Sequence, residues 1–150
     1  MIFRMLSVLF VILLLALPAT SLHAEGKATA GEAEHVVVQH ILIGFKRSIP
    51  GKKVDLTKKE AKALAGEILE RARKGEEFDA LVKEYTNDTY PGIFLLANKG
   101  IPIRAGERKR SDMVQGFSDI AFSLEVGEIG MAPFHAYKSP YGWHIILRLE

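Results

Sequence analysis

The stretch HVVVQHILI, residues 35–43, decides the fold of this chain. It is rich in β-branched residues and apolar on both faces, which is typical of a central strand that is covered on both sides. Because side chains alternate along a strand, His40 points to the same face as Val38 and Leu42. The sequence therefore predicts a histidine in the middle of a buried strand.

Two helices are predicted to follow this strand. Residues 44–55 contain Pro and Gly and show no periodicity, so we expect a loop there. Thr57 and Glu60 form a capping box, and apolar residues then recur at helical spacing up to Gly75, which ends the first helix. A second, shorter helix follows and is broken by the turn-forming residues 86–92.

The C-terminal half predicts shorter elements. They are a strand over 93–97, an exposed basic excursion over 98–112, helical turns over 113–124, and two strands over 132–138 and 143–149. The last two strands are separated by a tight turn and are therefore expected to pair antiparallel. The order of strands and helices predicts one α+β domain rather than a parallel αβα sandwich.

Residues 1–24 have the pattern of a secretory signal peptide. Arg4 is followed by an almost wholly apolar run over residues 5–17 and then by small or polar residues up to Ala24. We expect cleavage after Ala24 or after Ser21, which gives an exported protein, periplasmic or secreted. The apolar run is shorter than the roughly 17–25 residues that a transmembrane helix needs, and a permanent N-terminal membrane anchor is the alternative.

Composition excludes several classes of function. The chain has no cysteine, which excludes disulfides, thiolate zinc sites, a thiol nucleophile and a lipid-modified cysteine. After Arg4, 19 basic and 18 acidic residues remain, so the concentrated basic face of a nucleic-acid binder is not expected. Residues 25–34, rich in Gly, Ala and Glu, predict a short flexible lead before a domain over 35–150.

Two histidines lie in predicted strands, His40 near the start of the domain and His144 near its end. Each can be a buried imidazole satisfied by hydrogen bonds, but a pair from opposite ends of the chain also suggests a site. His35 and His135 lack the short spacing of metal ligands, so no zinc site is predicted. Ser139 has no Gly-x-Ser-x-Gly elbow around it, which disfavours a hydrolase.

Five motifs, in order along the chain from Val36 to Glu150, resemble the parvulin-type peptidyl-prolyl cis-trans isomerases. They are VQHILI (38–43), the helix over 57–75 leading into EEFDAL (76–81), MVQGFSDIAFSL (113–124), VGEIG (126–130) and SPYGWHIILR (139–148). The resemblance implies a four-stranded antiparallel sheet wrapped by helices. It also implies a pocket for the substrate proline on one face of the sheet.

The resemblance further implies roles for individual residues. His40 and His144 correspond to the paired central histidines of the family, which hydrogen-bond beneath the catalytic groove. Met113 and Phe117 correspond to the walls that grip the prolyl ring, and Phe122 to a neighbouring core or pocket residue.

Two further positions complete the implied site. Ser139 stands where the family has a Thr or Ser bonded to the histidine pair, and Asp88 stands where members carry Cys or Asp. In its Asn-Asp-Thr context, Asp88 is also a good turn residue. Residues 90–112 depart from the family pattern, which has a Gly-Gly-Asp-Leu-Gly turn with a pocket leucine, and Phe94 or Leu96 is the candidate replacement.

The resemblance therefore implies a cofactor-free and metal-free isomerase that acts on proline-containing unfolded or folding polypeptides outside the cytoplasm. Its polar residues would act through electrostatics and orientation, and Asp at position 88 excludes a covalent thiol mechanism. The alternative is a non-catalytic holdase that uses the same apolar groove. The basic loop with Lys46, Arg47, Lys52 and Lys53 is either a solvated loop or a reader of acidic groups before the proline.

Overall fold

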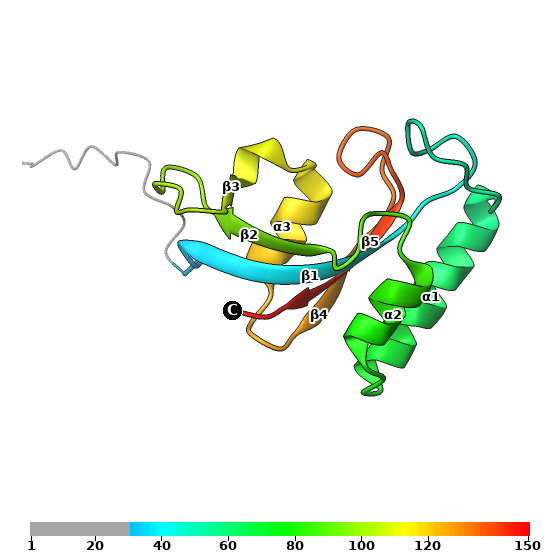
Figure 1. Cartoon of the computed structure of the whole chain (residues 1–150), viewed down its shortest axis with the longest axis horizontal. Helices are drawn as coiled ribbons and strands as arrows, with labels where there is room; N and C mark the ends of the chain where they lie inside the picture. Colours follow the sequence, from blue (N-terminus) through cyan, green and yellow to red (C-terminus); the bar gives the residue numbers. More distant parts are fainter. Residues whose placement is uncertain (1–30) are drawn as a thin grey trace, which may run out of the picture.

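The computed structural model describes residues 31–150 (Figure 1). The predicted signal peptide and the first part of the predicted lead lie outside the described residues. The elements are β1 (His35–Ile43), α1 (Lys58–Arg73), α2 (Phe78–Tyr85), β2 (Ile93–Ala97), β3 (Arg108–Lys109), the short 3₁₀ helix η1 (Arg110–Asp112), α3 (Gln115–Ser123), β4 (Ile129–Ala132) and β5 (Trp143–Arg148).

The five strands form one sheet in the order β3-β2-β1-β5-β4, with β1 at its centre. The four strands β2, β1, β5 and β4 pair antiparallel, as the resemblance implied. The sheet is nevertheless mixed, because β3 pairs parallel to β2 through Leu96 and Arg108. The two-residue strand β3 is too short and too charged to carry an alternating pattern, so the sequence did not predict it.

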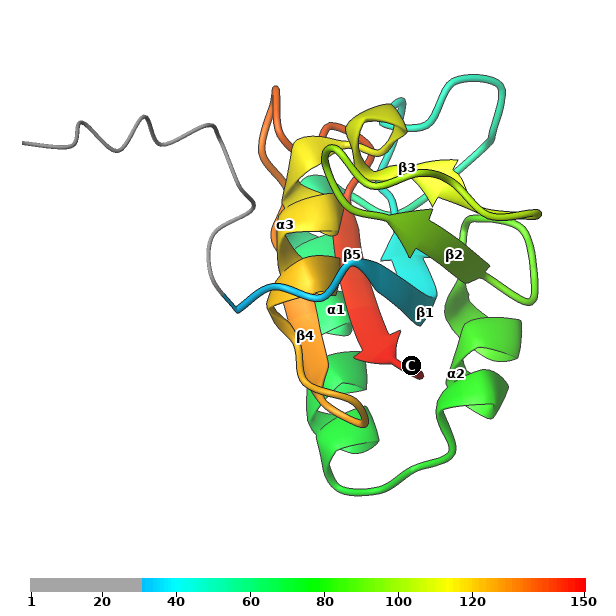
Figure 2. The same cartoon turned by 90° about the vertical axis from the view of Figure 1, so that its left-hand side faces the viewer.

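Helices cover both faces of the sheet (Figures 1 and 2). On one face, α1 and α2 pack against Ile41 and Ile43 of β1. On the other face, α3 packs through Phe117 against Val36 and Val38. The strand β1 therefore contributes to both apolar cores, which confirms the prediction of a central strand covered on both sides.

Local signals place the two N-terminal helices where the sequence predicted them. The Thr57 hydroxyl accepts a hydrogen bond from the Glu60 N–H at 3.2 Å, and the Glu60 carboxylate accepts one from the Thr57 N–H at 2.7 Å. The Glu77 carboxylate caps α2 by accepting a hydrogen bond from the N–H of Ala80 at 2.6 Å. Gly75, with φ of 94°, follows α1 as expected.

The prediction of a strand over residues 132–138 is wrong. The strand β4 spans Ile129–Ala132 and pairs with β5 from Ile129 opposite Leu147 to Ala132 opposite His144. Pro133, which has no N–H for a ladder, follows β4 directly. A longer loop over 133–142 then replaces the tight turn, and within it His135 and Ser139 form an isolated bridge.

The folded part of the chain begins before His35. Glu32 accepts a hydrogen bond from the Arg110 guanidinium at 2.6 Å, and the backbone C=O of Glu34 accepts one from Asn98 at 2.8 Å. The last residues of the predicted flexible lead are therefore fixed to the domain. Within residues 31–150, no helix has both the length and the apolar character needed to cross a membrane.

Candidate active site

A groove of about 440 Å³ lies on the face of the sheet that α3 covers. Its floor comes from β1 and β5, and its sides come from the loop over 44–55, the turn after α2, the strands β2 and β3, and the start of α3. The lining residues are His40, Leu42, Ile49, Pro50, Asp88, Phe94, Arg108, Asp112, Met113, Val114, Phe117, Tyr141 and His144. The chain thus brings together residues that lie far apart in the sequence.

Four aromatic rings meet in this groove, two histidines on its floor and two phenylalanines on its walls. The rings of His40 and His144 stack with centroids 5.6 Å apart, and their strands are adjacent in the sheet. Phe94 and Phe117 lie 5.1 and 5.2 Å from the ring of His40 and 5.6 Å from each other. The two histidines predicted from the sequence therefore do lie side by side, enclosed by two phenylalanines.

The turn after α2 brings Asp88 and a backbone carbonyl to His40. The Nε2 of His40 lies 3.4 Å from a carboxylate oxygen of Asp88, and its Nδ1 lies 3.2 Å from the C=O of Gly92. A Cβ at Gly92 would lie 2.6 Å from the His40 C=O, so this close approach requires glycine. The turn is tied to β1 by Gln39, whose amide donates hydrogen bonds to Asp79 and to the C=O of Pro91.

Asp88 is held in its ionised form. The hydrogen bond from His40 lowers the pKa of Asp88 to about 2, and the backbone N–H of Thr89 contributes in the same direction against the effect of burial. The carboxylate is partly exposed, with 38% of its side chain accessible, whereas His40 is only 2% exposed. The groove therefore has a fixed negative charge at its rim, oriented by a buried imidazole.

His144 is held in its neutral form. Burial, together with the neighbouring His40, lowers the pKa of His144 to about 3. Within residues 31–150, neither ring nitrogen of His144 has a hydrogen-bond partner. The hydrogen-bonded histidine pair implied by the resemblance is therefore wrong in this detail, because the two rings stack instead.

Ser139 also differs from the expectation. Its hydroxyl is fully buried and donates a hydrogen bond to the C=O of Gly142 at 3.1 Å, not to either histidine. The neighbouring C=O of Lys138 accepts a hydrogen bond from the N–H of Gly116 in α3. Ser139 therefore holds the loop over 133–142 in place beside the groove and does not line it.

The apolar walls are partly as expected. Met113 and Phe117 both line the groove, as the resemblance implied. Phe122 does not line it, because its ring lies in the core beneath the guanidinium carbon of Arg110, at 4.7 Å. Of the two candidates for the missing wall, Phe94 lines the groove and Leu96 is fully buried.

Arg108 and Tyr141 are among the groove residues that sequence reasoning missed. The guanidinium carbon of Arg108 lies 5.4 Å from the centre of the Phe94 ring. Nothing distinguished Arg108 from the other basic residues of the excursion, since only the pairing of β3 with β2 brings it here. Tyr141, in the turn Ser-Pro-Tyr-Gly, could have been found as a partly exposed aromatic residue beside a predicted site strand.

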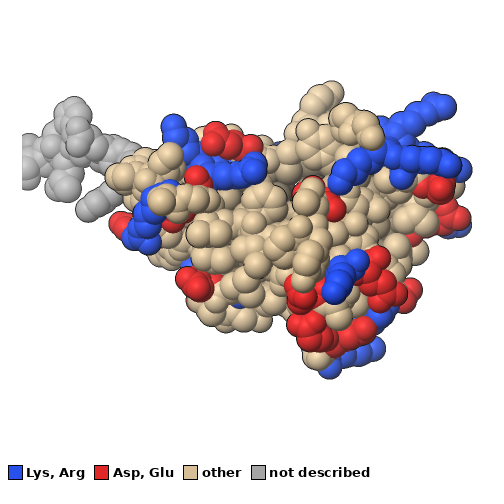
Figure 3. Space-filling model, viewed as in Figure 1, with Lys and Arg blue, Asp and Glu red and all other residues tan. Residues whose placement is uncertain are grey.

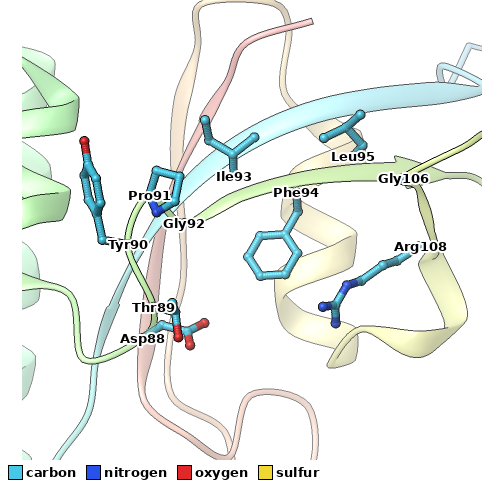
Figure 4. A pocket seen from close by; sticks show the side chains of 10 residues that line it. All are labelled: Asp88, Thr89, Tyr90, Pro91, Gly92, Ile93, Phe94, Leu95, Gly106 and Arg108. Atoms are coloured by element: carbon cyan, nitrogen blue, oxygen red, sulfur yellow. The ribbon is translucent and has the colours of Figure 1, made fainter.

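A second hollow of about 450 Å³ adjoins the groove (Figure 4). It runs beside residues 88–95 and is closed at one end by Gly106 and Arg108. Asp88, Phe94 and Arg108 line both spaces, and Figure 4 shows the Phe94 ring between the other two side chains. No group of three or more His, Asp or Glu side chains in the described part of the chain is placed to bind a metal ion.

Comparisons with known proteins agree with this geometry. A model of the rotamase family, described as the PpiC-type PPIase domain, matches residues 40–150. The foldase protein PrsA of Caldanaerobacter subterraneus is 42% identical over 82 residues, which is 55% of this chain and 23% of that protein. The chaperone SurA of Chromohalobacter salexigens is 32% identical over 123 residues, which is 77% of this chain and 23% of that protein.

Two further similarities cover a larger share of the other protein. The peptidyl-prolyl cis-trans isomerase pin4 of Emericella nidulans is 32% identical over 81 residues, which is 54% of this chain and 56% of that protein. The solution structure of TbPIN1 shares the fold, with a TM-score of 0.58 and 19% identity over 79% of this chain and 99% of that one. The chain spans about a quarter of the length of the PrsA and SurA proteins that it matches.

Proposed function

Since the chain belongs to the PpiC-type family of peptidyl-prolyl cis-trans isomerases, we propose that it isomerises X-Pro bonds in unfolded or folding polypeptides. The observation that carries this proposal is the groove itself. Its apolar walls, Met113, Phe117 and Phe94, stand beside the polar pair of His40 and Asp88. This combination suits a prolyl ring attached to a polar amide.

The reaction needs little more than such a groove. Rotation about an amide bond meets a barrier of about 18–20 kcal/mol because resonance is lost in the twisted state, and no covalent bond breaks. A wall that holds the prolyl ring while the preceding carbonyl turns lowers this barrier if it fits the twisted form better than the planar one. Met113 and Phe117 would grip the ring, and exclusion of water would disfavour the more polar planar amide.

The polar residues would act by electrostatics. Asp88 keeps its negative charge at neutral pH because its pKa is about 2, and His40 fixes the position of that charge. His144 stays neutral beneath the groove and stacks on His40, so it keeps that ring in place without adding a competing charge. Such a preorganised arrangement stabilises the twisted amide without reorganising during the reaction.

The test is acceleration of cis-trans exchange in a proline peptide, measured by NMR with the full chain. Met113→Ala removes most of one wall, and we expect a fall in kcat/KM of about tenfold or more, as for a lost pocket contact. Met131→Ala is the matched control, because Met131 is also half-buried but packs in the core on the other face of the sheet. An inert wild-type chain that still binds the peptide would contradict the proposal.

A second candidate function is that of a holdase, which binds unfolded segments without isomerising them. The hollow beside β2 favours it, because this space extends the groove beyond what one proline needs. Suppression of client aggregation by a chain that leaves cis-trans exchange unchanged would select this function.

We propose that the basic loop is solvated and does not read acidic residues. The Lys52 ammonium donates a hydrogen bond to the C=O of Asn87 at 2.6 Å, and Lys53 lies 3.9 Å from Asp55. Equal turnover of Glu-Pro, phospho-Ser-Pro and Leu-Pro peptides is expected. A clear preference for the phosphorylated peptide would overturn this reading.

We propose export as the cellular context, and the pattern of residues 1–24 is its support. The clients would then be polypeptides that fold outside the cytoplasm. The chemistry suits that location, because rotation about a peptide bond consumes neither ATP nor a reductant.

A further inference from the structure

We propose that the open edge of β2 binds the client segment next to the substrate proline as an added strand. This inference rests on the proposed function and names how the same site holds a longer polypeptide. It depends on the backbone of β2, on the hollow beside that backbone, and on the continuity of the hollow with the groove.

Two backbone hydrogen bonds, one at each end of β2, show which way its N–H and C=O groups point. The C=O of Gly92 accepts from the N–H of His40, and the N–H of Asn98 donates to the C=O of Glu34. The backbone N–H and C=O groups of the even-numbered residues in this stretch therefore point towards β1. Because the direction alternates along an antiparallel strand, the N–H and C=O groups of Ile93 point to the opposite edge.

This opposite edge is only partly covered. The strand β3 is in register with Leu96 and Ala97 alone, and Gly106, whose φ is 84°, shortly precedes it. Within residues 31–150, no strand therefore lies beside Ile93. Pairing with β3 begins at Leu96, so the edge is open from Ile93 to Leu95. Unpaired groups at a strand edge are a template for pairing with another chain.

The uncovered residues of this edge are themselves apolar. Proteins usually blunt exposed edges with charges, prolines or bulges, whereas Ile93 and Leu95 are 44% and 38% exposed, and Pro91 and Arg108 stand only at the two ends of the hollow. In the space-filling view of Figure 3, the surface over β2 and β1 carries few charged side chains, which gather instead towards its two ends. An edge left open and apolar is expected to have a partner.

The hollow of about 450 Å³ identifies that partner as an extended polypeptide. It follows the backbone from Asp88 to Leu95, so a ligand in it lies along the strand. Three residues of extended chain span about 10 Å, which is the length of the uncovered part of β2. Pairing requires alternating N–H and C=O groups, which a polypeptide supplies and other ligands do not.

Continuity with the groove places the proline. Asp88, Phe94 and Arg108 line both spaces, so one polypeptide can occupy the two together. Proline has no N–H and cannot donate to the ladder, so it must lie in the groove while residues beside it pair with β2. The added strand would fix the chain on one side of the proline while the bond turns.

Hydrogen exchange tests the proposal directly. With the full chain and a proline peptide at saturation, we expect the amide hydrogens of Ile93 and Leu95 to exchange more slowly than in the free protein. Peptides methylated at single backbone nitrogens within three residues of the proline provide the second arm. At one or more of these positions, loss of one hydrogen bond should weaken binding about threefold to tenfold. Equal binding of all the methylated peptides, with unchanged exchange at both amides, would overturn the proposal.

A protein variant provides an independent arm. Leu95→Pro removes the N–H that faces the edge and leaves the pairing of β2 with β1 intact, whereas Leu95→Ala shortens the same side chain and keeps the N–H. We expect Leu95→Pro to weaken peptide binding more than Leu95→Ala does. Circular dichroism melting of both variants separates this effect from unfolding, and equal binding by the two folded variants would count against the edge.

Two other outcomes separate this inference from its alternatives. Cis-trans exchange measured in the same samples distinguishes the isomerase proposal from the edge-binding proposal. Protection of the Ile93 and Leu95 amides without turnover would contradict only the isomerase proposal. Turnover without such protection would contradict only the edge-binding proposal. Protection of Ile93 and Leu95 that grows with protein concentration in the absence of peptide would assign the edge to a second copy of this chain.

Discussion

His40 lies between two residues with opposite electrostatic constraints. On one side Asp88 stays charged, and on the other His144 stays neutral. The hydrogen bond from His40 keeps Asp88 ionised, whereas burial, with His40 as the second cause, keeps His144 neutral. The pH dependence of the site should therefore involve Asp88 and His144.

The first prediction concerns stability and pH. The pKa of His144 is lowered from 6.5 to about 3 in the folded chain, so the unfolded chain binds more protons between these values. Stability from His144 is therefore fully present above about pH 6.5 and is lost as the pH falls towards 3, with a slope of up to about 1.4 kcal/mol per pH unit.

Urea unfolding at pH 7 and pH 5 measures this effect. We expect His144→Phe to lose less stability over that interval than the wild type does. His135→Phe is the control, because His135 is exposed. The same loss of stability in all three proteins would show that His144 is not the group responsible.

The second prediction concerns the charge of Asp88. Asp88→Asn keeps the shape of the side chain and removes the charge, and we expect kcat/KM for a proline peptide to fall about tenfold or more. Asp112→Asn removes the other carboxylate that lines the groove, and we expect a smaller loss. If both variants kept wild-type turnover, electrostatic stabilisation by Asp88 would be wrong.

Among the elements, α1 supports the sheet from the face opposite the groove. Its capping box satisfies two backbone N–H groups at the start of the helix. Thr57→Ala should therefore lower the free energy of unfolding by about 1 kcal/mol and leave the groove unaltered. Urea unfolding measures the stability, and peptide turnover measures the state of the groove. Lys62→Ala, on the exposed side of α1, is the control. A fall in turnover under conditions where the Thr57→Ala variant is still folded would contradict this separation.

How far the elements could be predicted depended on how local their signals are. The capping residues and apolar periodicity of α1, and the β-branched run of β1, are local and gave the correct elements. The strand β4 was misplaced because Ile129–Ala132 is short and contains Gly130, which lies so close to α3 that a Cβ would be 3.0 Å from Ile120. Such an approach exists only in the folded molecule.

The same distinction applies to the site. Met113, Phe117 and both histidines could be placed because they lie in motifs that resemble a known family. The bond from Ser139 to Gly142 and the stacking of the histidines depend on side-chain rotamers that no sequence pattern specifies. Arg108 reaches the groove only through the pairing of β3 with β2.

For the whole molecule, the prediction concerns its N-terminus. We expect the mature protein recovered from an expressing bacterium to begin near Glu25, because residues 1–24 have the pattern of a cleaved signal. N-terminal sequencing of the protein outside the cytoplasm checks this. An intact chain beginning at Met1 in washed membranes would support the alternative of an N-terminal anchor.

The position of β1 has a consequence for the order of folding. It pairs with β2 on one side, but its other neighbour is β5, with Val38 opposite Arg148. The centre of the sheet is therefore completed only after β5 has been synthesised, and contacts so distant in sequence are slow to form. We expect the domain to remain unfolded during synthesis, which is the state that export across a membrane by an unfolded-chain route requires. For the export proposed above, this order of events means that the chain would fold only after it had crossed the membrane.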